Sequence, residues 1–560
     1  MASSVYAQMQ DNIWVFGYDY NPGDGLSEST QFAFGDSLVI TNHQRPMQLN
    51  PSNAMISDKS GKLLILSNGC YVEKADGTAI ENSEGMNPGA LYDNCEEKEG
   101  YNIKNSILLP DPGNSSIYHI FHLPSDITPQ IGLFYAVMQS SFDLSANGGS
   151  GKTLFINKVW VSDTIDYDGI HAVRHANGRD WWILTAKRSS NRYYVLLLNP
   201  QGIFVKYQSI GEPTWSTSGG DIVFSPDGSR VARFNAKDDL RVFNFDRCTG
   251  ELSNPLHVKI TGPGDNQLFS SLAWSADGHY LYAQENYLIY QFDMWAANIP
   301  ASQTVVSEWD PTAKCPFQVV FGFMELGPDG RIYDRPLNGQ RCMHRMQFPE
   351  RAGTACNMQR SYFNFTYPYK SIPHFPNFRL GPIDGSPCDT LGLDNHPLAG
   401  WRHDFVSGLT ADFTSVSWYE PTTWWWDFGD NSPSVTERNP THTFPAPGQY
   451  EVCLTVSNQY GSDTKCKKVW ITTVGEEEPE GSGEAIRLYP NPTSGEVFWT
   501  GTSGAVRVRV FNALGQMHWE RTVNGNHLSL GNAPDGFYTV QIFSEAGALL
   551  CVSKVFLSQH

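Results

Sequence analysis

The side chains best suited to catalysis or metal binding are scattered along the sequence, and few of them have the spacing of a known catalytic or metal-binding site. His171 and His175 lie four residues apart, a spacing that binds metal when both residues share one face of a helix. Here they flank a predicted strand and turn, so we expect no metal site from them. The sequence has no Gly-x-Ser-x-Gly motif, no Gly-x-x-x-x-Gly-Lys-Ser/Thr loop and no His-Glu-x-x-His motif. We therefore predict no catalytic residue, no metal and no cofactor.

Several aspartates instead follow a recurring turn. Ser-Pro-Asp-Gly, Ser-Ala-Asp-Gly and Gly-Pro-Asp-Gly contain Asp227, Asp277 and Asp329. The Asp-box of sialidases needs Ser-x-Asp-x-Gly-x-x-Trp, whereas here Gly follows Asp directly. Asp-Gly supplies the positive φ of a tight hairpin. We interpret these aspartates as turn residues.

These turns belong to a repeat of about fifty residues. Its turn glycines recur at intervals of 50 to 65 residues, at Gly61, Gly113, Gly178, Gly228, Gly278 and Gly330. An alternating apolar strand follows most of them, and few segments carry a helical period. Small antiparallel sheets that recur in this way bury their faces by radial stacking. The pattern predicts a β-propeller over residues 9–383, with seven blades or, as the alternative, six. We expect 12–20 and 31–40 to complete a blade with strands near 361–369.

Composition limits the class of protein further. The 560 residues include 58 acidic and 39 basic side chains, a net charge of −19, which argues against nucleic acid and anionic membranes as partners. No stretch approaches the ~18 apolar residues of a transmembrane helix. The length predicts several domains, and the apolar content excludes bulk disorder.

Ten cysteines form no Cys-x-x-Cys motif and no zinc-finger spacing. Their even number is compatible with disulfides in an exported chain, although sequence alone does not assign the pairing. The shortest loops would be closed by the pairs Cys70–Cys95, Cys342–Cys356 and Cys453–Cys466. The last pair is favoured because both residues lie on one predicted hairpin.

Residues 12–400 also resemble a propeller common in secreted proteins of Bacteroidetes. The matching pieces include NIWVFG, ISDKSGKLLILSNG, VRHANGRDWWILT, FSPDGSRVARF and IPHFPNFRLGPIDGSPCDTLGLDN. The turns also resemble those of TolB-like and WD40-like repeats. The resemblance implies a fold and an exported location but no reaction.

After a connector at 384–401, residues 402–474 show short strands and frequent turns, the pattern of a β-sandwich. Trp426–Asp430, His442, Phe444 and the turn at 447–450 resemble the signature of the polycystic kidney disease (PKD) domain, an immunoglobulin-like module. Strand alternation places Trp424 and Trp426 on one face and Trp425 on the other. We expect Trp426 in the core and Trp425 partly exposed. There it either stacks on a glycan or packs against a neighbour.

The acidic segment 475–484 is predicted to be a linker. The domain that follows it, residues 485–560, is predicted to be a small β-sandwich of about seven strands. That domain resembles the type A C-terminal sorting domain of the type IX secretion system. The residues that match its pattern are Pro490, Asn491, Pro492, Gly495, Gly515, Gly536, Tyr538 and Lys554.

The resemblance implies a route and partners. The chain would cross the inner membrane with a signal peptide, of which residues 1–8 would be a remnant or a disordered start. The sorting domain would meet the shuttle and sortase-like components of the secretion machinery, and the product would reach the cell surface or the extracellular space.

Three functions remain open. The first is a non-catalytic binding or adhesion protein for a protein or glycan ligand, with the propeller as platform and the PKD domain as spacer. The second is an enzyme acting on an extracellular polymer at the propeller mouth. The third is a structural surface or filament subunit.

Overall fold

The computed structural model describes residues 8–21, 26–49, 52–89, 106–128, 131–215, 219–235, 237–260, 269–315, 317–337, 339–471, 488–489, 493, 495–499, 505–512, 516–531, 533–544 and 549–557. The chain is all-β, as the sequence predicts. The described residues contain, besides strands, three short 3-10 turns: η2 (Asn147–Gly149), η3 (Pro300–Ser302) and η4 (Gly353–Cys356). Within these ranges, no helix has the length and apolar character needed to cross a membrane.

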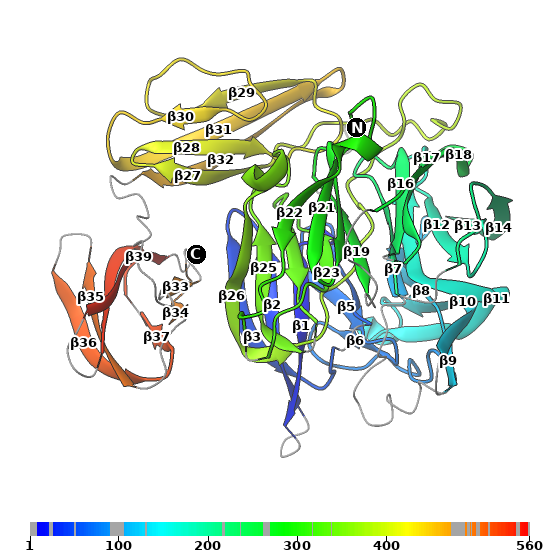
Figure 1. Cartoon of the computed structure of the whole chain (residues 1–560), viewed down its shortest axis with the longest axis horizontal. Helices are drawn as coiled ribbons and strands as arrows, with labels where there is room; N and C mark the ends of the chain where they lie inside the picture. Colours follow the sequence, from blue (N-terminus) through cyan, green and yellow to red (C-terminus); the bar gives the residue numbers. More distant parts are fainter. Residues whose placement is uncertain are drawn as a thin grey trace.

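The N-terminal module is a β-propeller whose blades stand around a common axis (Figure 1). Its innermost strands follow one another around the ring in the order β1, β4, β7, β11, β15, β19 and β23. The described residues thus form seven blades, the larger of the two expected numbers.

The first three blades contain the following strands. Blade 1 has β1 (Ile13–Asn21), β2 (Leu26–Phe34) and β3 (Leu38–Arg45). Blade 2 has β4 (Ala54–Ser57), β5 (Leu63–Ser67) and β6 (Val72–Lys74). Blade 3 has β7 (Ser106–Pro110), β8 (Ile117–His122), β9 (Ser125–Thr128), β10 (Ile131–Asp143) and the first half of β11 (Lys152–Arg174).

The other four blades follow the same plan. Blade 4 has the second half of β11, β12 (Trp181–Lys187), β13 (Arg192–Asn199) and β14 (Gly202–Ser209). Blade 5 has β15 (Asp221–Phe224), β16 (Arg230–Asn235), β17 (Asp239–Asp246) and β18 (Glu251–Val258). Blade 6 has β19 (Ser270–Trp274), β20 (Tyr280–Glu285), β21 (Leu288–Asp293) and β22 (Thr304–Glu308). Blade 7 has β23 (Phe323–Leu326), β24 (Ile332–Arg335), β25 (Gln340–Met346) and β26 (Met358–Tyr369).

The long strand β11 joins two blades. Its first part pairs with β10, and its last part, from Ile170 to Arg174, pairs with β12. Blades 3 and 4 therefore form one continuous sheet. The interval from Gly113 to Gly178 contains these long strands and is 65 residues long, whereas the other intervals of the repeat are 50 to 52 residues.

The repeated turns have the predicted chemistry. Asp227 Oδ1 accepts a hydrogen bond from the backbone N of Ser229 at 3.0 Å, and Asp277 Oδ1 accepts one from His279 N at 3.1 Å. Gly228 and Gly278 adopt φ of 72° and 71°. These contacts hold the hairpins between the first and second strands of blades 5 and 6.

Apolar clusters lie between neighbouring blades, which is how each sheet buries its faces. Trp182 and Phe243 belong to a cluster between blades 4 and 5, and Trp274 to one between blades 5 and 6. Blades 1 and 7 meet in the same way, since Phe16 packs on Phe365 with ring centroids 5.4 Å apart. This corrects the expected mixed blade: the two ends of the propeller pack face to face, but β26 hydrogen-bonds only within blade 7.

Residues 370–379, here called the axial segment, run from the end of β26 into the centre of the ring. Its side chains are largely buried although it forms no strand. Asn53 of blade 2 donates to Ser371 Oγ at 3.1 Å, Asn377 donates to Pro226 O at 2.6 Å, and Arg174 Nη2 donates to Phe378 O at 3.3 Å. The protein's own chain thus fills the middle of the propeller.

The second module is a β-sandwich of two three-stranded sheets. One sheet has β27 (Trp401–Ser407), β28 (Thr410–Ser415) and β30 (Thr441–Thr443). The other has β29 (Thr423–Asp427), β31 (Gly448–Asn458) and β32 (Gly461–Ile471). Trp426 and Phe428 lie in the core between them, as predicted.

This sandwich, which we call the cap, rests on blades 7 and 1. Arg331 Nη2 lies 2.6 Å from Asp404 Oδ1, and Arg402 Nη2 lies 3.0 Å from Glu350 Oε1. The turn at Gly330 touches the cap directly, because a Cβ there would lie 2.7 Å from Val416 Cγ1. The cap is therefore bonded to the propeller over several buried contacts.

The C-terminal module is a second small sandwich (Figure 1), and Phe537 in it packs on Trp470 of the cap with ring centroids 5.5 Å apart. Its described strands form two sheets, of three and four strands. The first sheet has β33 (Leu488–Tyr489), β34 (Glu496–Trp499) and β37 (His527–Ser529). The second has β35 (Ala505–Asn512), β36 (Met517–Asn524), β38 (Gly536–Phe543) and β39 (Leu549–Leu557). The seven described strands match the expected number.

The cysteines agree with the sequence prediction in part. Cys453 and Cys466 face each other across β31 and β32 and form the predicted disulfide. Cys70 is disulfide-bonded, and its expected partner Cys95 lies outside the described residues.

The predicted pair Cys342–Cys356 is wrong, because both residues are free thiols. Cys342 faces Cys315, with Sγ 4.0 Å from the Cys315 carbonyl oxygen, whereas Cys356 packs in the cluster between blades 6 and 7.

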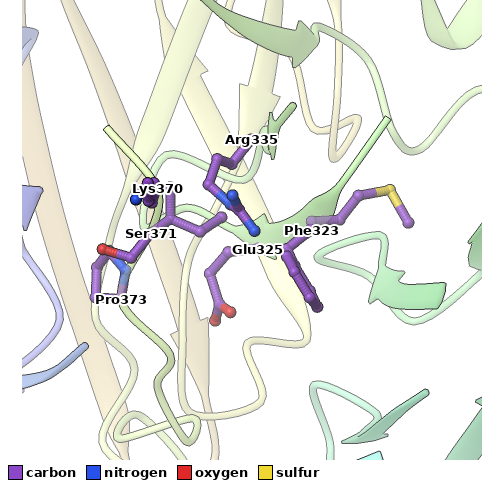
Figure 2. A pocket seen from close by; sticks show the side chains of 8 residues that line it. Phe323, Glu325, Arg335, Lys370, Ser371 and Pro373 are labelled. Carbon is purple, nitrogen blue, oxygen red and sulfur yellow. The ribbon is translucent and has the colours of Figure 1, made fainter. Parts of the chain in front are cut away.

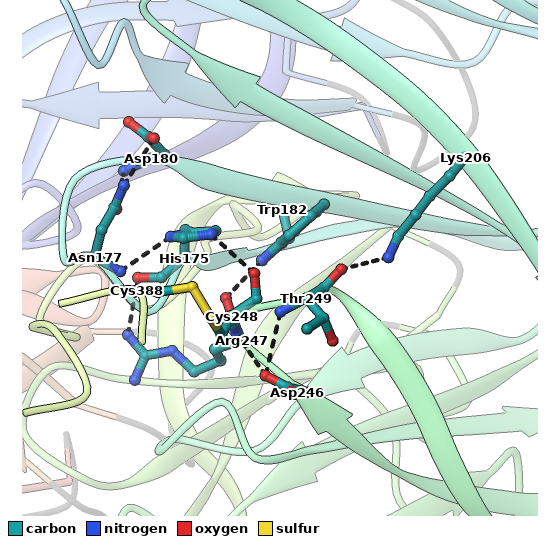
Figure 3. Close-up of a disulfide and its surroundings, with 10 residues drawn as sticks. All are labelled: His175, Asn177, Asp180, Trp182, Lys206, Asp246, Arg247, Cys248, Thr249 and Cys388. Atoms are coloured by element: carbon teal, nitrogen blue, oxygen red, sulfur yellow. Dashed lines mark hydrogen bonds between the residues drawn. A yellow bond between two sulfur atoms is a disulfide. The ribbon is translucent and has the colours of Figure 1, made fainter. Parts of the chain in front are cut away.

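A disulfide that the sequence did not predict joins Cys248 of blade 5 to Cys388 (Figure 3). It ties the connector between axial segment and cap to the propeller. Arg247 beside it donates to the carbonyls of Arg174 and Gly381, and Trp182 Nε1 donates to Arg247 O at 2.7 Å. The connector is thus held by a covalent bond and by hydrogen bonds at the same place.

Candidate functional site

The centre of the propeller is the first place to look for a site, because the inner strands of all blades converge there. The axial segment leaves two cavities beside β23. One opens toward the cap, and the space in it that water can enter is about 80 Å³. The other lies at the opposite end of β23, and the space in it that water can enter is only about 10 Å³. We call them the cap-side cavity and the far-side pocket; both include Met324 and Glu325 in their walls.

The cap-side cavity contains a cluster of titratable side chains. His374 Nδ1 lies 3.1 Å from Glu325 Oε2, and the ring of His171 lies 4.6 Å from that of His374. All three side chains are buried or nearly so. A carboxylate that orients an imidazole in this way is one element of general acid–base chemistry.

The remaining walls of this cavity combine an ion pair with apolar side chains. Arg379 forms an ion pair with Asp11 and donates to Asn12 Oδ1 at 2.6 Å. Trp274, Phe375 and, from the cap, Trp418 form apolar walls. Serine, cysteine and lysine are absent from the described lining.

The far-side pocket has a different character. Figure 2 shows Arg335, Lys370, Glu325 and Phe323 around it, with the Arg335 guanidinium directed toward the space near Glu325 and Phe323. The Arg335 Cζ lies 4.8 Å from the centre of the Phe323 ring. Burial lowers the pKa of Arg335 to about 10.

The two histidines that the sequence places four residues apart can now be located in the fold. No group of three or more His, Cys, Asp or Glu side chains there is placed to hold a metal ion. His171 lies on β11 and His175 just beyond its end, where His175 Nε2 lies 3.1 Å from Cys248 O. The two histidines therefore lie in different environments and do not form a metal-binding pair.

Residues 146–153, Ala-Asn-Gly-Gly-Ser-Gly-Lys-Thr, come close to a phosphate-binding loop, with Ala146 in place of its first glycine. The structure places them in the hairpin between β10 and β11, with the single turn η2 and a strand rather than a helix after it. The helix N-terminus that such a loop needs is missing from these described residues.

Trp425 is the exposed aromatic residue that the sequence predicted. It is 55% exposed, while Trp426 is completely buried and Trp424 is partly buried. Across the sheet it faces Thr455, which in turn faces Thr464, and the two threonine hydroxyls lie 2.8 Å apart. An aromatic ring beside hydroxyls on a flat sheet is a surface on which a sugar can stack.

The residues matched to the sorting pattern are only partly described. Tyr538 is buried and donates to Pro534 O at 2.7 Å, and Gly495 and Gly536 adopt φ of 140° and 150°. Lys554 lies on β39 opposite Thr539. Pro490, Asn491, Pro492 and Gly515 lie outside the described residues.

Sequence reasoning missed His374 of the axial segment and Glu325 and Arg335 of blade 7. None lies in a recognisable motif, and they meet only because the axial segment enters the ring. The available signal was the run IPHFPNF, an apolar stretch too rich in proline for a strand.

Comparisons with known proteins bear mainly on the cap. Residues 406–473 match the PKD domain family, so the cap is a PKD domain. The PKD1 domain of the Vibrio cholerae metalloprotease PrtV is 32% identical and covers 14% of this chain and 99% of its own, with a TM-score of 0.13. No curated protein matches the chain.

Two further solved structures are similar over longer parts of the chain. A proposed 6-phosphogluconolactonase of Bacteroides fragilis is 14% identical and covers 66% of this chain and 99% of its own, with a TM-score of 0.38. PorZ of Porphyromonas gingivalis, described as an essential surface component of the type IX secretion system, is 10% identical. It covers 97% of this chain and 81% of its own, with a TM-score of 0.22. Neither similarity assigns an activity to this chain.

Proposed function

We propose that this chain is an exported, non-catalytic binding protein that presents a rigid propeller–PKD body to a protein or glycan ligand. The observation that carries the proposal is the axial segment. Residues 370–379 occupy the centre of the ring and leave only small cavities beside β23, and the cap covers one side. The exposed aromatic residues, such as Trp425 and Trp295, lie elsewhere on the surface.

The PKD domain acts in this proposal as a fixed cap, which revises the expected role as a spacer. A spacer domain would move independently of its neighbour. Here the Arg331–Asp404 and Arg402–Glu350 ion pairs attach the PKD domain to blade 7. The Cys248–Cys388 disulfide holds the connector as well. The cap and propeller would therefore present their surfaces in one constant arrangement.

The binding proposal is tested with the full chain on an array of bacterial and host glycans and extracellular proteins. Trp425→Ala should abolish the strongest glycan signal and leave thermal stability unchanged, because more than half of that side chain is exposed. Trp215→Ala removes a tryptophan of the propeller that is 74% exposed and serves as the matched control. Turnover of a glycan or peptide by the purified chain would contradict a non-catalytic role.

We further propose that residues 485–560 are a type IX sorting domain that meets the shuttle and sortase-like components of that machinery. The resemblance of LYPNP, the Gly536–Tyr538 turn and the terminal strand supports it, as does the two-sheet sandwich of the described residues. The product would then reach the cell surface or the extracellular space.

Deletion of 485–560 in the native host tests this route. The truncated chain should accumulate in the periplasm, and the intact chain should appear at the surface with a cut between 474 and 485. Tyr538→Ala is the milder variant, since the loss of its buried ring should reduce export. Normal surface display of the truncated chain would show that residues 485–560 are not needed for export.

The second candidate, an enzyme acting on an extracellular polymer, has one observation in its favour. The His374–Glu325 contact beside His171 places an imidazole and a carboxylate at one cavity. His374→Gln should then abolish turnover of the polymer while His279→Gln, at a partly exposed position on blade 6, leaves it intact. Absence of turnover on acidic and neutral polysaccharides alike would remove this candidate.

A further inference from the structure

Two thiols in the described part of the propeller face each other without a disulfide between them. Cys315 lies between β22 and β23, where the chain passes from blade 6 to blade 7, and Cys342 lies on β25. Cys315 is partly exposed, whereas Cys342 is completely buried. Cys342 Sγ lies 4.0 Å from the Cys315 carbonyl oxygen, and the two thiols form a hydrogen bond. The two side chains are therefore in contact.

Hydrogen bonds hold the two segments side by side. Arg341 N donates to Cys315 O at 3.1 Å, and Gln340 Nε2 donates to Gln318 O at 3.0 Å. Cys342 follows Arg341 directly, so these bonds keep Cys315 beside it in the folded chain. A disulfide needs such an arrangement, because two cysteines whose Cα atoms are more than about 7 Å apart cannot be bridged without movement of the backbone.

Cys356, the partner that the sequence suggested for Cys342, has a different environment. It packs in the apolar cluster between blades 6 and 7. Burial raises the pKa of its thiol to about 11. The thiol beside Cys342 is therefore that of Cys315, although 26 residues separate the two in the sequence.

The two facing thiols also differ in reactivity. The hydrogen bond with Cys342, together with the backbone N–H and the charge of Arg341, lowers the pKa of Cys315. The same hydrogen bond and burial raise the pKa of Cys342. The thiolate is the form that attacks a disulfide. Because Cys315 is also partly exposed, it is the thiol that an external disulfide meets first.

We propose that Cys315 and Cys342 are a thiol-oxidation site, which forms a further disulfide of this protein by exchange with an external disulfide. The Cys315 thiolate attacks one sulfur of that disulfide, which leaves a mixed disulfide and releases the first thiol. The Cys342 thiol then gives up its proton and attacks Cys315 Sγ, which forms the Cys315–Cys342 bond and releases the second thiol. The pair loses two electrons and two protons, and the external disulfide takes up both as two thiols.

The new bond would fix the entry into the central strand of blade 7. Phe323 begins β23 and pairs with Arg335, the last residue of β24, and Cys342 lies near the start of the strand that follows. The turn after the other end of β23 touches Val416 of the cap. The bond would therefore lie on the face of the propeller that the cap does not cover. This goes beyond the binding function and the export route proposed above.

Peptide mapping of the full chain tests the proposal. The purified protein is incubated with oxidised glutathione, denatured in the presence of N-ethylmaleimide and digested with trypsin without reduction. Trypsin cuts after Lys314, Arg331, Arg341 and Arg345, so peptides 315–331 and 342–345 should appear as one linked species. Its presence before glutathione is added would also support the proposal. Cys551→Ser removes a partly exposed thiol of the C-terminal module and should leave the linked species unchanged.

Two variants test the order of attack. Cys342→Ala should retain one glutathione on Cys315 as a stable mixed disulfide, because the second thiol is missing. Cys315→Ser should leave Cys342 unmodified by glutathione, because Cys342 is buried.

The map of the wild-type chain does not depend on the folding of any variant. The proposal is overturned if N-ethylmaleimide modifies both thiols of the glutathione-treated wild type, if Cys342 is linked to Cys356, or if Cys342→Ala takes up no glutathione on Cys315. None of these results depends on the export route or on ligand binding.

Discussion

The ionic contact between the cap and the propeller allows a quantitative test. Asp404 is the centre of a buried network: its Oδ1 lies 2.6 Å from Arg331 Nη2 and 2.9 Å from Gln347 Nε2, and its Oδ2 lies 3.4 Å from Arg402 Nε. Burial alone would raise the pKa of Asp404. The charges of Arg331 and Arg402 outweigh burial and hold that pKa well below its usual range.

Asp404→Ala should therefore be severe. It leaves the nearly buried Arg331 with Asp329 alone and removes one of the two carboxylates beside Arg402. Removing one partner of a buried pair costs about 3–5 kcal/mol. The matched control is Asp36→Ala, which removes an exposed propeller–cap ion pair, Asp36–Lys465 at 2.8 Å, whose side chains are 63% and 43% exposed. An exposed pair is worth at most about 1 kcal/mol.

Urea unfolding at pH 7, followed by tryptophan fluorescence, measures both variants against the wild type. We expect the midpoint to fall much further for Asp404→Ala than for Asp36→Ala. Because a depressed carboxylate pKa stabilises the fold above its unfolded value of ~3.9, the difference should persist at neutral pH and shrink only on acidification below about pH 4. Equal losses in the two variants, or a loss below about 1 kcal/mol for Asp404→Ala, would refute the buried network as the main bond between cap and propeller.

Three further predictions concern a turn, a buried acid and a thiol. Gly330→Ala should destabilise the cap contact by about 1–3 kcal/mol more than Gly385→Ala in a thermal melt, since both glycines have φ near 70° but only Gly330 lies against Val416; equal shifts would show that backbone strain alone matters. Burial raises the pKa of Asp334 to about 7, so the protonated form is the one that the fold favours. The free energy of unfolding of the wild type relative to Asp334→Asn should then fall as pH rises from about 4 to 7 and level off above; a difference independent of pH would contradict a neutral Asp334. Burial also raises the pKa of the Cys356 thiol to about 11, so iodoacetamide at pH 8 should modify Cys356 only after denaturation, and its modification in the native chain, measured by peptide mass spectrometry, would contradict the buried position.

The sequence predicted the elements that depend on local chemistry. The Asp-Gly turns and alternating strands identified the propeller, and the Trp-Asp-Phe-Gly-Asp signature identified the PKD domain with Trp426 inside and Trp425 outside. The Cys453–Cys466 pair was predictable because both residues lie on one hairpin.

What the sequence did not predict depends on distant contacts. The expected pair Cys342–Cys356 was chosen for its short loop, but β25 and η4 direct the two thiols to different neighbours. The Cys248–Cys388 pair spans 140 residues and requires the connector to return to blade 5. The axial cavities had no sequence signal for the same reason: Arg335 and His374 lie on segments whose positions are fixed only when the ring closes around residues 370–379.

The Cys248–Cys388 bond has a mechanical consequence for a protein that would hold a ligand under flow. Cys388 lies between the axial segment and the cap, so a force that pulls the cap away from the propeller travels back along the chain only as far as Cys388. From there the disulfide passes it to blade 5. The disulfide thus takes up part of the tension that the chain between 370 and 387 would otherwise carry, and it helps to keep the axial segment in the ring while it remains oxidised.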